Sequence, residues 1–336
     1  MDNFTKYALD LGGEIHPLII PAEEHNGLGL MNPSVYNHNG KILINLRSVN
    51  YTFYHSEMKL FHHPYGPLTY LHPENDINLK TWNYYLELDD DLQVSRYNKI
   101  DTSALDQKPL WEFHGLEDAR LVNWNNKFYI TGVRRDTTVN GQGRMELSEL
   151  QISDSEVKEV ARFRIPCPLD PPGEFTQDIY CEKNWMPVVN QPFTYVKWSN
   201  PTELVKVDMQ ANKTTTIHQE QTAKMAAFPR GGSQVLPWKD GYIALTHEVD
   251  LTKHETGRKD AVYTHRFIIW NKNFDVVKCS EQFSIMNGLV EFSCGMCEYK
   301  ENDMLITFGF QDNAAFVLRC SKKAIDDFIN GVYDVK

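Results

Sequence analysis

Five stretches of this chain repeat one strand–turn–strand pattern, and that repetition limits the folds open to the chain more than any other feature. Each stretch has polar or small residues, a short apolar run, a turn, a longer apolar strand and polar residues again. The five units lie near residues 32–51, 117–136, 182–201, 231–250 and 293–312. Short strands separated by turn residues are typical of all-β folds, and a unit that recurs favours radial repetition. The sequence therefore predicts an all-β fold, a five-bladed β-propeller that forms a single domain over residues 1–336, with a short terminal helix in "KKAIDDFINGVYDV".

The turn lies in the middle of every unit, so both ends of each unit should meet at one mouth of the central channel. The inner strands are expected near residues 34–36, 119–123, 185–188, 234–237 and 294–298. Polar residues at the unit ends would then surround one pocket. They are Arg47, Asn50, Glu117, Asp118, Arg120, Arg134, Asp136, Lys183, Asn184, His247, Glu248 and Asp312. Acids and bases that converge in this way indicate a site for an anionic or polyhydroxylated ligand.

The segment "GLEDARL", which begins at Gly115, resembles the G-x-E-D-P-R signature of glycoside hydrolase family 130, the β-mannoside phosphorylases and their relatives. "CEKNWMPV", "GGSQVLPWKDGYIALTHEV" and "VEFSCGM" with "ITFGFQD" are similar to later blades of that family, in the same order. The chain departs from the pattern at Ala119, where the family has Pro, and at Glu248, where it has Gly. The resemblance implies a five-bladed propeller that acts on sugars. The related eukaryotic mannosyltransferase/phosphorylase family shares that fold and transfers mannose from an activated donor.

By this resemblance Asp118 is the catalytic general acid that protonates the glycosidic oxygen. A carboxyl beside a second carboxylate can have a raised pKa, which suits such a donor. Glu117 is expected to be structural, paired with a nearby Arg. Phosphate would be bound by cations, of which Arg120, Lys183 and His247 match the family's positions. The full set of expected anion-binding residues is Arg47, Arg120, Arg134, Lys183 and His247, and the expected substrate-binding residues are Asn50, Asp136, Asn184, Glu248, Glu291 and Asp312.

Several functions are compatible with this site. The first is an inverting glycoside phosphorylase, or a related glycosyl transfer on β-mannoside-like sugars. A nucleotide-sugar-dependent glycosyltransferase would place the same cations on a diphosphate. An inverting hydrolase would need a base such as Glu248, Glu291 or Asp312, and a non-catalytic carbohydrate-binding propeller would keep only the pocket. The loop at 170–175 is expected to reach over the mouth as a lid.

Composition narrows the partners. The formal net charge of −11 argues against nucleic acid as the main partner. No membrane-spanning segment and no secretory signal are evident, which predicts a cytoplasmic protein. The six cysteines are irregularly spaced, and the single C-x-x-C at Cys294 and Cys297 has no second pair, so no metal site is expected. The expected partner is an oligosaccharide or sugar-phosphate substrate. No cofactor is expected, although inorganic phosphate could serve as a co-substrate. An oligomer is compatible with the sequence.

Overall fold

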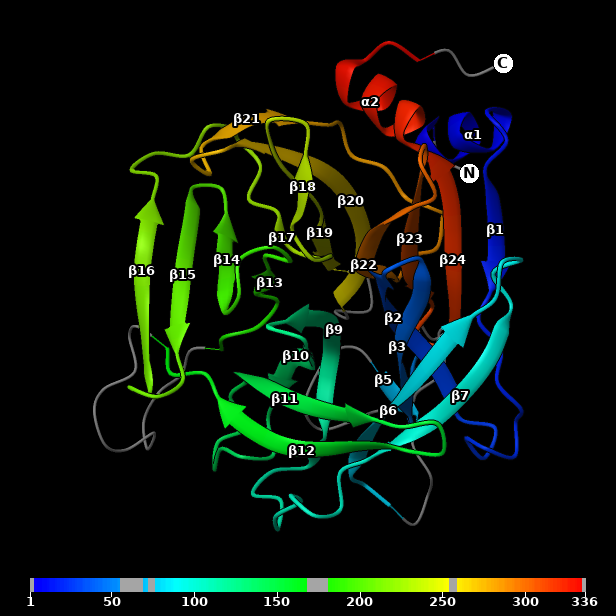
Figure 1. Cartoon of the computed structure of the whole chain (residues 1–336), viewed down its shortest axis with the longest axis vertical. Coiled ribbons are helices and arrows are strands. Elements are labelled where there is room, and N and C mark those ends of the chain that lie inside the picture. Colours follow the sequence, from blue (N-terminus) through cyan, green and yellow to red (C-terminus); the bar gives the residue numbers. More distant parts are fainter. Residues whose placement is uncertain (1–2, 55–68, 72–75, 168–180, 254–258, 334–336) are drawn as a thin grey trace.

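The strands are arranged radially around a central axis in the computed structural model (Figure 1), which describes residues 3–54, 69–71, 76–167, 181–253 and 259–333. Five sets of antiparallel strands surround this axis, so the predicted five-bladed β-propeller is confirmed. The organisation of residues 1–336 as a single domain stays a prediction, and the expected lid at 170–175 lies outside the described residues. No helix in the described part of the chain is long and apolar enough to cross a membrane.

The first two blades are joined at their outer edges into one nine-stranded sheet. The first blade consists of β2 (Gly29–His38), β3 (Lys41–Val49), β6 (Leu79–Leu88) and β7 (Val94–Asp101). The second consists of β9 (Leu116–Trp124), β10 (Lys127–Arg134), β11 (Arg144–Ile152) and β12 (Val157–Arg164). The joint is a short parallel pairing between β7 and β12. Two additions are β8 (Phe113–His114), which pairs with β6, and the ribbon of β4 (Thr52–Tyr54) with β5 (Thr69–Leu71).

The other three blades are separate sheets. The third consists of β13 (Met186–Pro187), β14 (Thr194–Ser199), β15 (Thr202–Asp208) and β16 (Lys213–Gln219). The fourth consists of β17 (Arg230–Gly231), β18 (Leu236–Trp238), β19 (Gly241–Lys253), β20 (Lys259–Asn271) and β21 (Val276–Cys279). The fifth consists of β22 (Glu291–Tyr299), β23 (Asp303–Phe310), β24 (Ala314–Ser321) and β1 (Glu14–Pro17). Because the N-terminal β1 pairs with β24, the fifth blade is closed by both ends of the chain.

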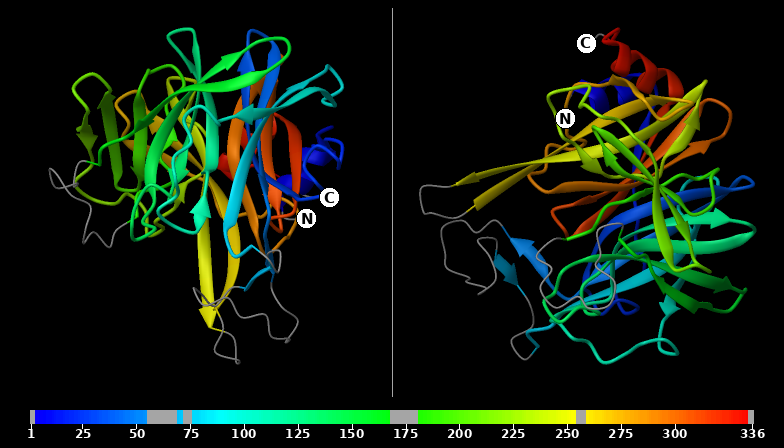
Figure 2. Two further views of the ribbon diagram at one scale, coloured as in Figure 1. Left: turned by 90° about the horizontal axis from the view of Figure 1, so that it is seen from below. Right: turned by 90° about the vertical axis from the view of Figure 1, so that its left-hand side faces the viewer.

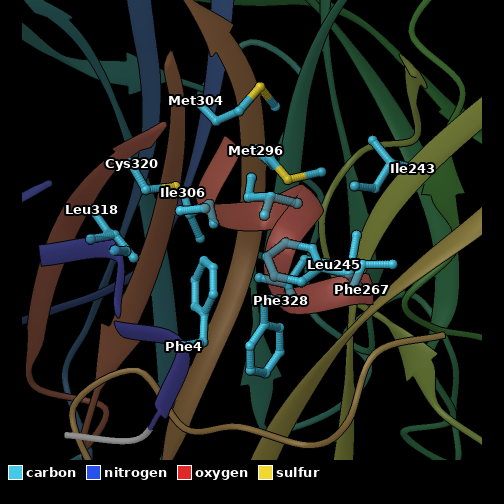
Figure 3. Close-up of a cluster of buried hydrophobic side chains, with 14 of the residues drawn as sticks. Phe4, Ile243, Leu245, Phe267, Met296, Met304, Ile306, Leu318, Cys320 and Phe328 are labelled. Atoms are coloured by element: carbon cyan, nitrogen blue, oxygen red, sulfur yellow. The ribbon is translucent and has the colours of Figure 1, made fainter. Parts of the chain in front are cut away.

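Two short helices cover the outer side of the fifth blade, α1 (Asn3–Asp10) and α2 (Lys322–Asn330). Phe4 and Phe328 bring the apolar faces of these helices onto Phe267 of the fourth blade, as Figure 3 shows. The hydroxyl of Ser321 caps the first turn of α2, and Gly331 ends the helix in the left-handed conformation at φ 65°. This large apolar cluster anchors both ends of the chain to the ring of blades.

The axis of the propeller is filled by side chains where the inner strands meet. Gln234 is fully buried and donates hydrogen bonds to the carbonyls of Val35 and Leu121, at 2.9 and 2.8 Å. Its own carbonyl accepts from the Met296 amide at 3.2 Å. One side chain therefore links the first, second, fourth and fifth blades. These links hold the inner strands in fixed relative positions, so the residues at their ends are also held in place.

Three of the inner strands carry a β-bulge near the same mouth of the axis. In β2, β9 and β22 the pairing register slips at residues 32–33, 118–119 and 293–294, where two residues face one on the neighbouring strand. A bulge twists a strand and redirects a side chain. The repeated bulge explains why the start of "GLEDAR" lacks a regular strand pattern.

Candidate functional site

A cavity of about 490 Å³ lies at this mouth of the propeller. Half of the predicted site residues line it, namely Arg47, Asp118, Lys183, Asn184, His247 and Asp312. They come from all five units of the sequence repeat. The long strands β19 and β20 extend beyond the other strands on the side where the β4–β5 ribbon projects (Figure 2), and they contribute Val249 and Tyr263 to the wall.

Four residues of the cavity wall share an unusual backbone conformation. Asn32, Asp118, Asn184 and Asp312 have left-handed φ angles of 44°, 47°, 60° and 50°. Asn and Asp tolerate this region better than other non-glycine residues, because their short side chains hydrogen-bond locally. The strain associated with such residues often occurs at functional sites. At Asp118 the bulge also needs Gly132 opposite, since a Cβ there would lie 2.4 Å from the Glu117 carbonyl oxygen.

Asp118 is held by side chains from the first blade. Its Oδ1 accepts hydrogen bonds from Asn32 Nδ2 at 2.7 Å and from Arg47 Nη1 at 2.8 Å, while Arg120 donates to its main-chain oxygen at 2.5 Å. Burial acts to raise the pKa of Asp118. Attraction to Arg47 and Arg120, the hydrogen bond from Asn32 and attraction to Lys183 outweigh burial and lower the pKa. These surroundings favour the carboxylate form.

Glu117 also lines the central cavity and lies beside two arginines. Its carboxylate lies 3.3 Å from Arg135 Nε and 3.9 Å from Arg47 Nη2. The prediction that Glu117 pairs with a nearby arginine is therefore confirmed. Because Arg47 contacts both Glu117 and Asp118, it joins the two adjacent acids of the motif to the first blade.

Asp312 is a second carboxyl of the cavity, and its pKa is shifted in the opposite direction to that of Asp118. Burial raises its pKa to about 6, since the attraction of Arg47 only partly offsets burial, and the negative charges of Asp118 and Glu117 add to the rise. The cavity thus contains one carboxyl that favours the ionised form and one that holds a proton at mildly acidic pH. Two carboxyls whose environments separate their pKa values are a common acid–base arrangement.

The third and fourth blades supply basic side chains to the same cavity. Lys183, Arg230 and His247 line it together with Tyr263, whose ring stacks on His247 at 6.0 Å. Burial raises the pKa of Tyr263 to about 12, and Asp312 and Asp118 add to the rise, so its hydroxyl keeps its proton.

His247 is neutral in these surroundings. Its pKa is well below the ordinary value because of burial and because of His265, Lys183 and the nearby arginines. Its Nδ1 lies 3.0 Å from the Gly231 carbonyl oxygen. A carbonyl oxygen only accepts, so the proton of the neutral ring is on Nδ1 and Nε2 is an acceptor.

Two predicted site residues lie beneath the cavity or away from it, in structural roles. Arg120 is fully buried, and its Nε donates to the Gly232 carbonyl at 2.9 Å. Together with its bond to the Asp118 carbonyl, this contact positions the bulge from below. Glu291 is also fully buried, and its carboxylate accepts from the backbone amides of Ile285 and Gly288, each at 2.6 Å. It therefore stabilises the turn before β22.

Asn50 and Glu248 also lie outside the cavity. Asn50 braces the start of β6, where its Oδ1 accepts from the Lys80 amide at 2.6 Å. Glu248 is paired with Arg266 and accepts from Gln282 Nε2 at 2.6 Å. Successive side chains of a strand point to opposite faces of the sheet. His247 faces the cavity, so its neighbour Glu248 points to the other face.

Arg134 and Asp136 line a second cavity of about 400 Å³ between the first and second blades. Arg135, which lies between them in the sequence, lines the central cavity instead. Neighbouring residues at the end of β10 and just beyond it thus line different cavities. The prediction that all polar unit ends converge on one pocket holds for only part of the set.

Sequence reasoning missed five polar residues of the central wall, namely Asn32, Tyr51, Arg135, Asn140 and Arg230. Position offered a signal in two cases, because Asn32 opens the first repeat unit and Arg230 directly precedes the fourth. Two aromatic residues of the central wall, Trp111 and Tyr263, offer ring surfaces on which a sugar could stack.

Solved structures with a similar fold include mannoside phosphorylases and a mannosyltransferase. No protein-family model matches the sequence, and no curated protein is significantly similar to it. The β-1,2-mannobiose phosphorylase from Listeria innocua aligns with a TM-score of 0.55 and 13% identity, over 94% of this chain and 97% of that one. A GH130 structure aligns with a TM-score of 0.57 and 15% identity, over 88% of this chain and 85% of that one. That family of mannoside phosphorylases contains hydrolases targeting β-1,2-mannosidic linkages in Candida mannan. MPT-1, a GDP-Man-dependent mannosyltransferase from Leishmania mexicana, aligns with a TM-score of 0.52 and 12% identity, over 92% of this chain and 89% of that one. The chain therefore shares the fold of the mannoside phosphorylases and of this mannosyltransferase, as the sequence resemblance implied.

Proposed function

We propose that this protein transfers glycosyl groups of mannosides and acts as an inverting glycoside phosphorylase. The observation that carries the proposal is the division of charge in the central cavity. Asp118 and Asp312 lie in the same cavity as Lys183, Arg230 and His247. A phosphorylase needs a proton donor for the leaving group and cations for the attacking phosphate, and carboxyl groups in one cavity with Lys183 and Arg230 are suited to these two tasks. The fold shared with the Listeria mannobiose phosphorylase supports the same assignment.

In the cleavage direction a phosphate oxygen would form a bond to the anomeric carbon as the glycosidic C–O bond breaks. The proton of Asp118 would pass to the departing oxygen, and the products would be a sugar 1-phosphate of inverted configuration and a shortened sugar. A phosphate beside Lys183 would offset its positive charge and raise the pKa of Asp118, so that the carboxyl can carry this proton. In the reverse direction the carboxylate would take the proton of the acceptor hydroxyl.

The phosphate would be held on the side of Lys183, Arg230 and Tyr263. The phenol of Tyr263 keeps its proton and is able to donate a hydrogen bond. An anion beside His247 would favour the protonated ring and raise its pKa, which turns Nε2 from an acceptor into a donor. Binding of phosphate would therefore be accompanied by proton uptake.

A nucleotide-sugar-dependent mannosyltransferase is the second candidate, favoured by the lowered pKa of Asp118. An ionised carboxylate is suited to accept a proton from an acceptor hydroxyl. The cations would then bind the diphosphate of the donor. The fold shared with the GDP-Man-dependent mannosyltransferase supports this alternative.

One experiment separates the candidates. The protein is incubated with β-linked mannobioses and inorganic phosphate, with the same sugars and no phosphate, and with GDP-mannose and free mannose. Release of mannose 1-phosphate only when phosphate is present is the expected result. Product from GDP-mannose alone would establish the transferase, free mannose without phosphate the hydrolase, and binding without turnover the carbohydrate-binding propeller.

The variant Asp118→Asn tests the acid role in the same assay. The amide keeps the size of the side chain but has no acidic proton, so turnover should fall by about 10²–10⁴. Sugar binding should change little. The variant Glu248→Gln is the matched control, because Glu248 is paired with Arg266 outside the cavity. Full turnover by Asp118→Asn would overturn the assignment.

A further inference from the structure

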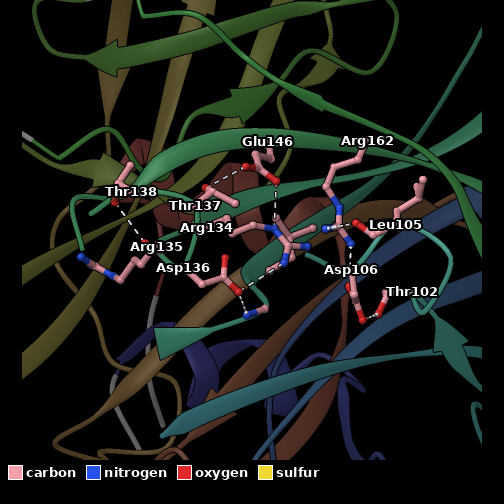
Figure 4. Close-up of polar contacts among 12 residues, drawn as sticks. Thr102, Leu105, Asp106, Arg134, Arg135, Asp136, Thr137, Thr138, Glu146 and Arg162 are labelled. Atoms are coloured by element: carbon pink, nitrogen blue, oxygen red, sulfur yellow. Dashed lines mark hydrogen bonds and ion pairs between the residues drawn. The ribbon is translucent and has the colours of Figure 1, made fainter. Parts of the chain in front are cut away.

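The second cavity, between the first and second blades, has the size and lining of a binding site. Its volume of about 400 Å³ falls within the range of about 300–1,000 Å³ that is usual for small-molecule sites. Apolar side chains of Trp82, Leu116 and Ile130 form part of the wall. Arg134, Asp136 and Arg162, whose polar contacts Figure 4 shows, form another part. A cavity with both kinds of surface suits a ligand with apolar and polar faces.

The arginines of this cavity already have acidic partners. Arg134 Nε lies 2.8 Å from Glu146 Oε2, and Arg162 Nη2 lies 2.5 Å from Glu159 and 3.0 Å from Asp106. A guanidinium that is neutralised in this way offers little extra attraction to an anion. The arrangement fixes the polar wall rigidly but disfavours a negatively charged ligand.

Two buried oxygen atoms of the same wall have no hydrogen-bond partner among the residues that the structure describes. They are Oδ1 of Asp136 and the hydroxyl of Ser148, whose residues are 8% and 1% exposed. The other carboxylate oxygen of Asp136 accepts from the Gly115 amide at 2.8 Å. A buried polar atom without a hydrogen-bond partner destabilises the fold, so a ligand that forms hydrogen bonds with both atoms removes this cost on binding. The pair consists of an acceptor and a hydroxyl, which matches the hydroxyl groups of a sugar or polyol.

The two cavities share one thin wall. On β8, Phe113 lines the central cavity and His114 lines the second one. Thr81 also lines the second cavity, and its hydroxyl accepts from Arg47 at 3.1 Å, while Arg47 binds Asp118. A ligand in the second cavity would therefore lie one residue away from the side chain that holds Asp118.

We propose that the second cavity is a binding site for a neutral, hydroxyl-bearing ligand with about the size of one sugar ring. The ligand would bind through its hydroxyls to Asp136 and Ser148 and through its apolar face to the wall around Trp82. The proposal is independent of the reaction at the central cavity, because it rests on residues that do not line that cavity.

Crystals soaked separately in mannose, glucose, glycerol and mannose 1-phosphate test the proposal, together with calorimetric titration of each compound. Electron density for at least one neutral compound between Asp136 and Ser148 is expected. Ser148→Ala, which removes the hydroxyl with little risk to folding, should weaken that binding about three- to tenfold, the equivalent of one neutral hydrogen bond. Lys183→Ala, in the central cavity, should leave it unchanged.

Three results would overturn the proposal. The first is that no neutral compound occupies the second cavity. The second is that mannose 1-phosphate occupies it and the neutral compounds do not. The third is that Ser148→Ala binds the located compound as tightly as the wild type. Leu110→Trp gives a second check at an exposed position of the rim, since the larger side chain should obstruct entry without disturbing the core.

Discussion

Replacing Arg47 with methionine would remove a buried positive charge from beside the two acids of the GLEDAR motif. Arg47 is 4% exposed, and its guanidinium donates to Asp118 at 2.8 Å and lies 3.9 Å from Glu117. Methionine keeps much of the length of the side chain but none of its charge. The variant therefore leaves the carboxylates of Asp118 and Glu117 without the positive charge of Arg47. It should unfold more easily than the wild type.

The cost of this change depends on pH. In the wild type the pKa of Asp118 lies below its ordinary value of 3.8, so Asp118 adds stability above that pH and loses it as the pH falls through the folded-state pKa. Without Arg47, burial should raise the pKa instead, and the buried carboxyl destabilises the fold increasingly as the pH rises. Keeping one such carboxyl protonated at pH 7 costs at most about 4 kcal/mol, at about 1.36 kcal/mol for each pH unit above 3.8. Near pH 4 the same term almost vanishes.

Thermal unfolding followed by circular dichroism at pH 7 and pH 4 measures the effect. A chain of 336 residues has an unfolding entropy of about 0.7 kcal/mol per kelvin, so about 4 kcal/mol corresponds to a fall in Tm of about 6 °C at pH 7. At pH 4 the fall in Tm should be smaller, because it should come only from the loss of the hydrogen bonds from Arg47 to Thr81 and Tyr51. Lys127→Met is the control, because Lys127 and its partner Glu149 form an exposed surface pair worth less than about 1 kcal/mol.

The fall in Tm at pH 7, compared with that at pH 4, decides whether Arg47 stabilises the fold through its charge. If Arg47→Met lowers Tm by the same amount at pH 7 and pH 4, charge compensation is not the role of Arg47. Its contribution would then lie in packing and neutral hydrogen bonds alone. A fall no larger than that of Lys127→Met at pH 7 would also refute the reasoning.

Three further predictions concern the same cavity. Lys183→Ala should raise the KM for phosphate by the equivalent of about 1.5–3 kcal/mol, because a charge-assisted contact is lost. Initial rates at varied phosphate concentration measure this, and an unchanged KM would count against an anion at Lys183. Asp312→Asn should raise Tm relative to the wild type above pH 6 but not below pH 4, since the raised pKa of Asp312 means that its ionised form destabilises the fold as the pH rises; an equal change at both pH values would contradict this. Gly132→Ala should lower both Tm and turnover, because its Cβ would lie 2.4 Å from the Glu117 carbonyl and displace the bulge, and wild-type activity in this variant would show that the bulge geometry is not needed.

Much of the fold could be predicted from the sequence because the information is local. The alternation of short apolar runs with turn residues repeats five times, and strand pairing within each unit follows from it. The terminal helix and the polar mouth could be predicted on the same basis. The joining of the first two blades by β7 and β12, and the closure of the fifth blade by β1, involve pairs far apart in the chain. No local pattern specifies such pairs.

For the site, the sequence by itself determined which charged residues lie near the ends of the units, with Asp118 at the centre of the motif. Only the tertiary structure decided which of them face one cavity. Asp118 reaches it through a bulge, and its partners Asn32 and Arg47 come from a different blade. Arg134 and Arg135 line different cavities although they are neighbours in the sequence. The physical reason is that strand side chains alternate with a period of two, so a shift of one residue moves a charge to the opposite face, and a bulge introduces that shift where the sequence pattern does not reveal it.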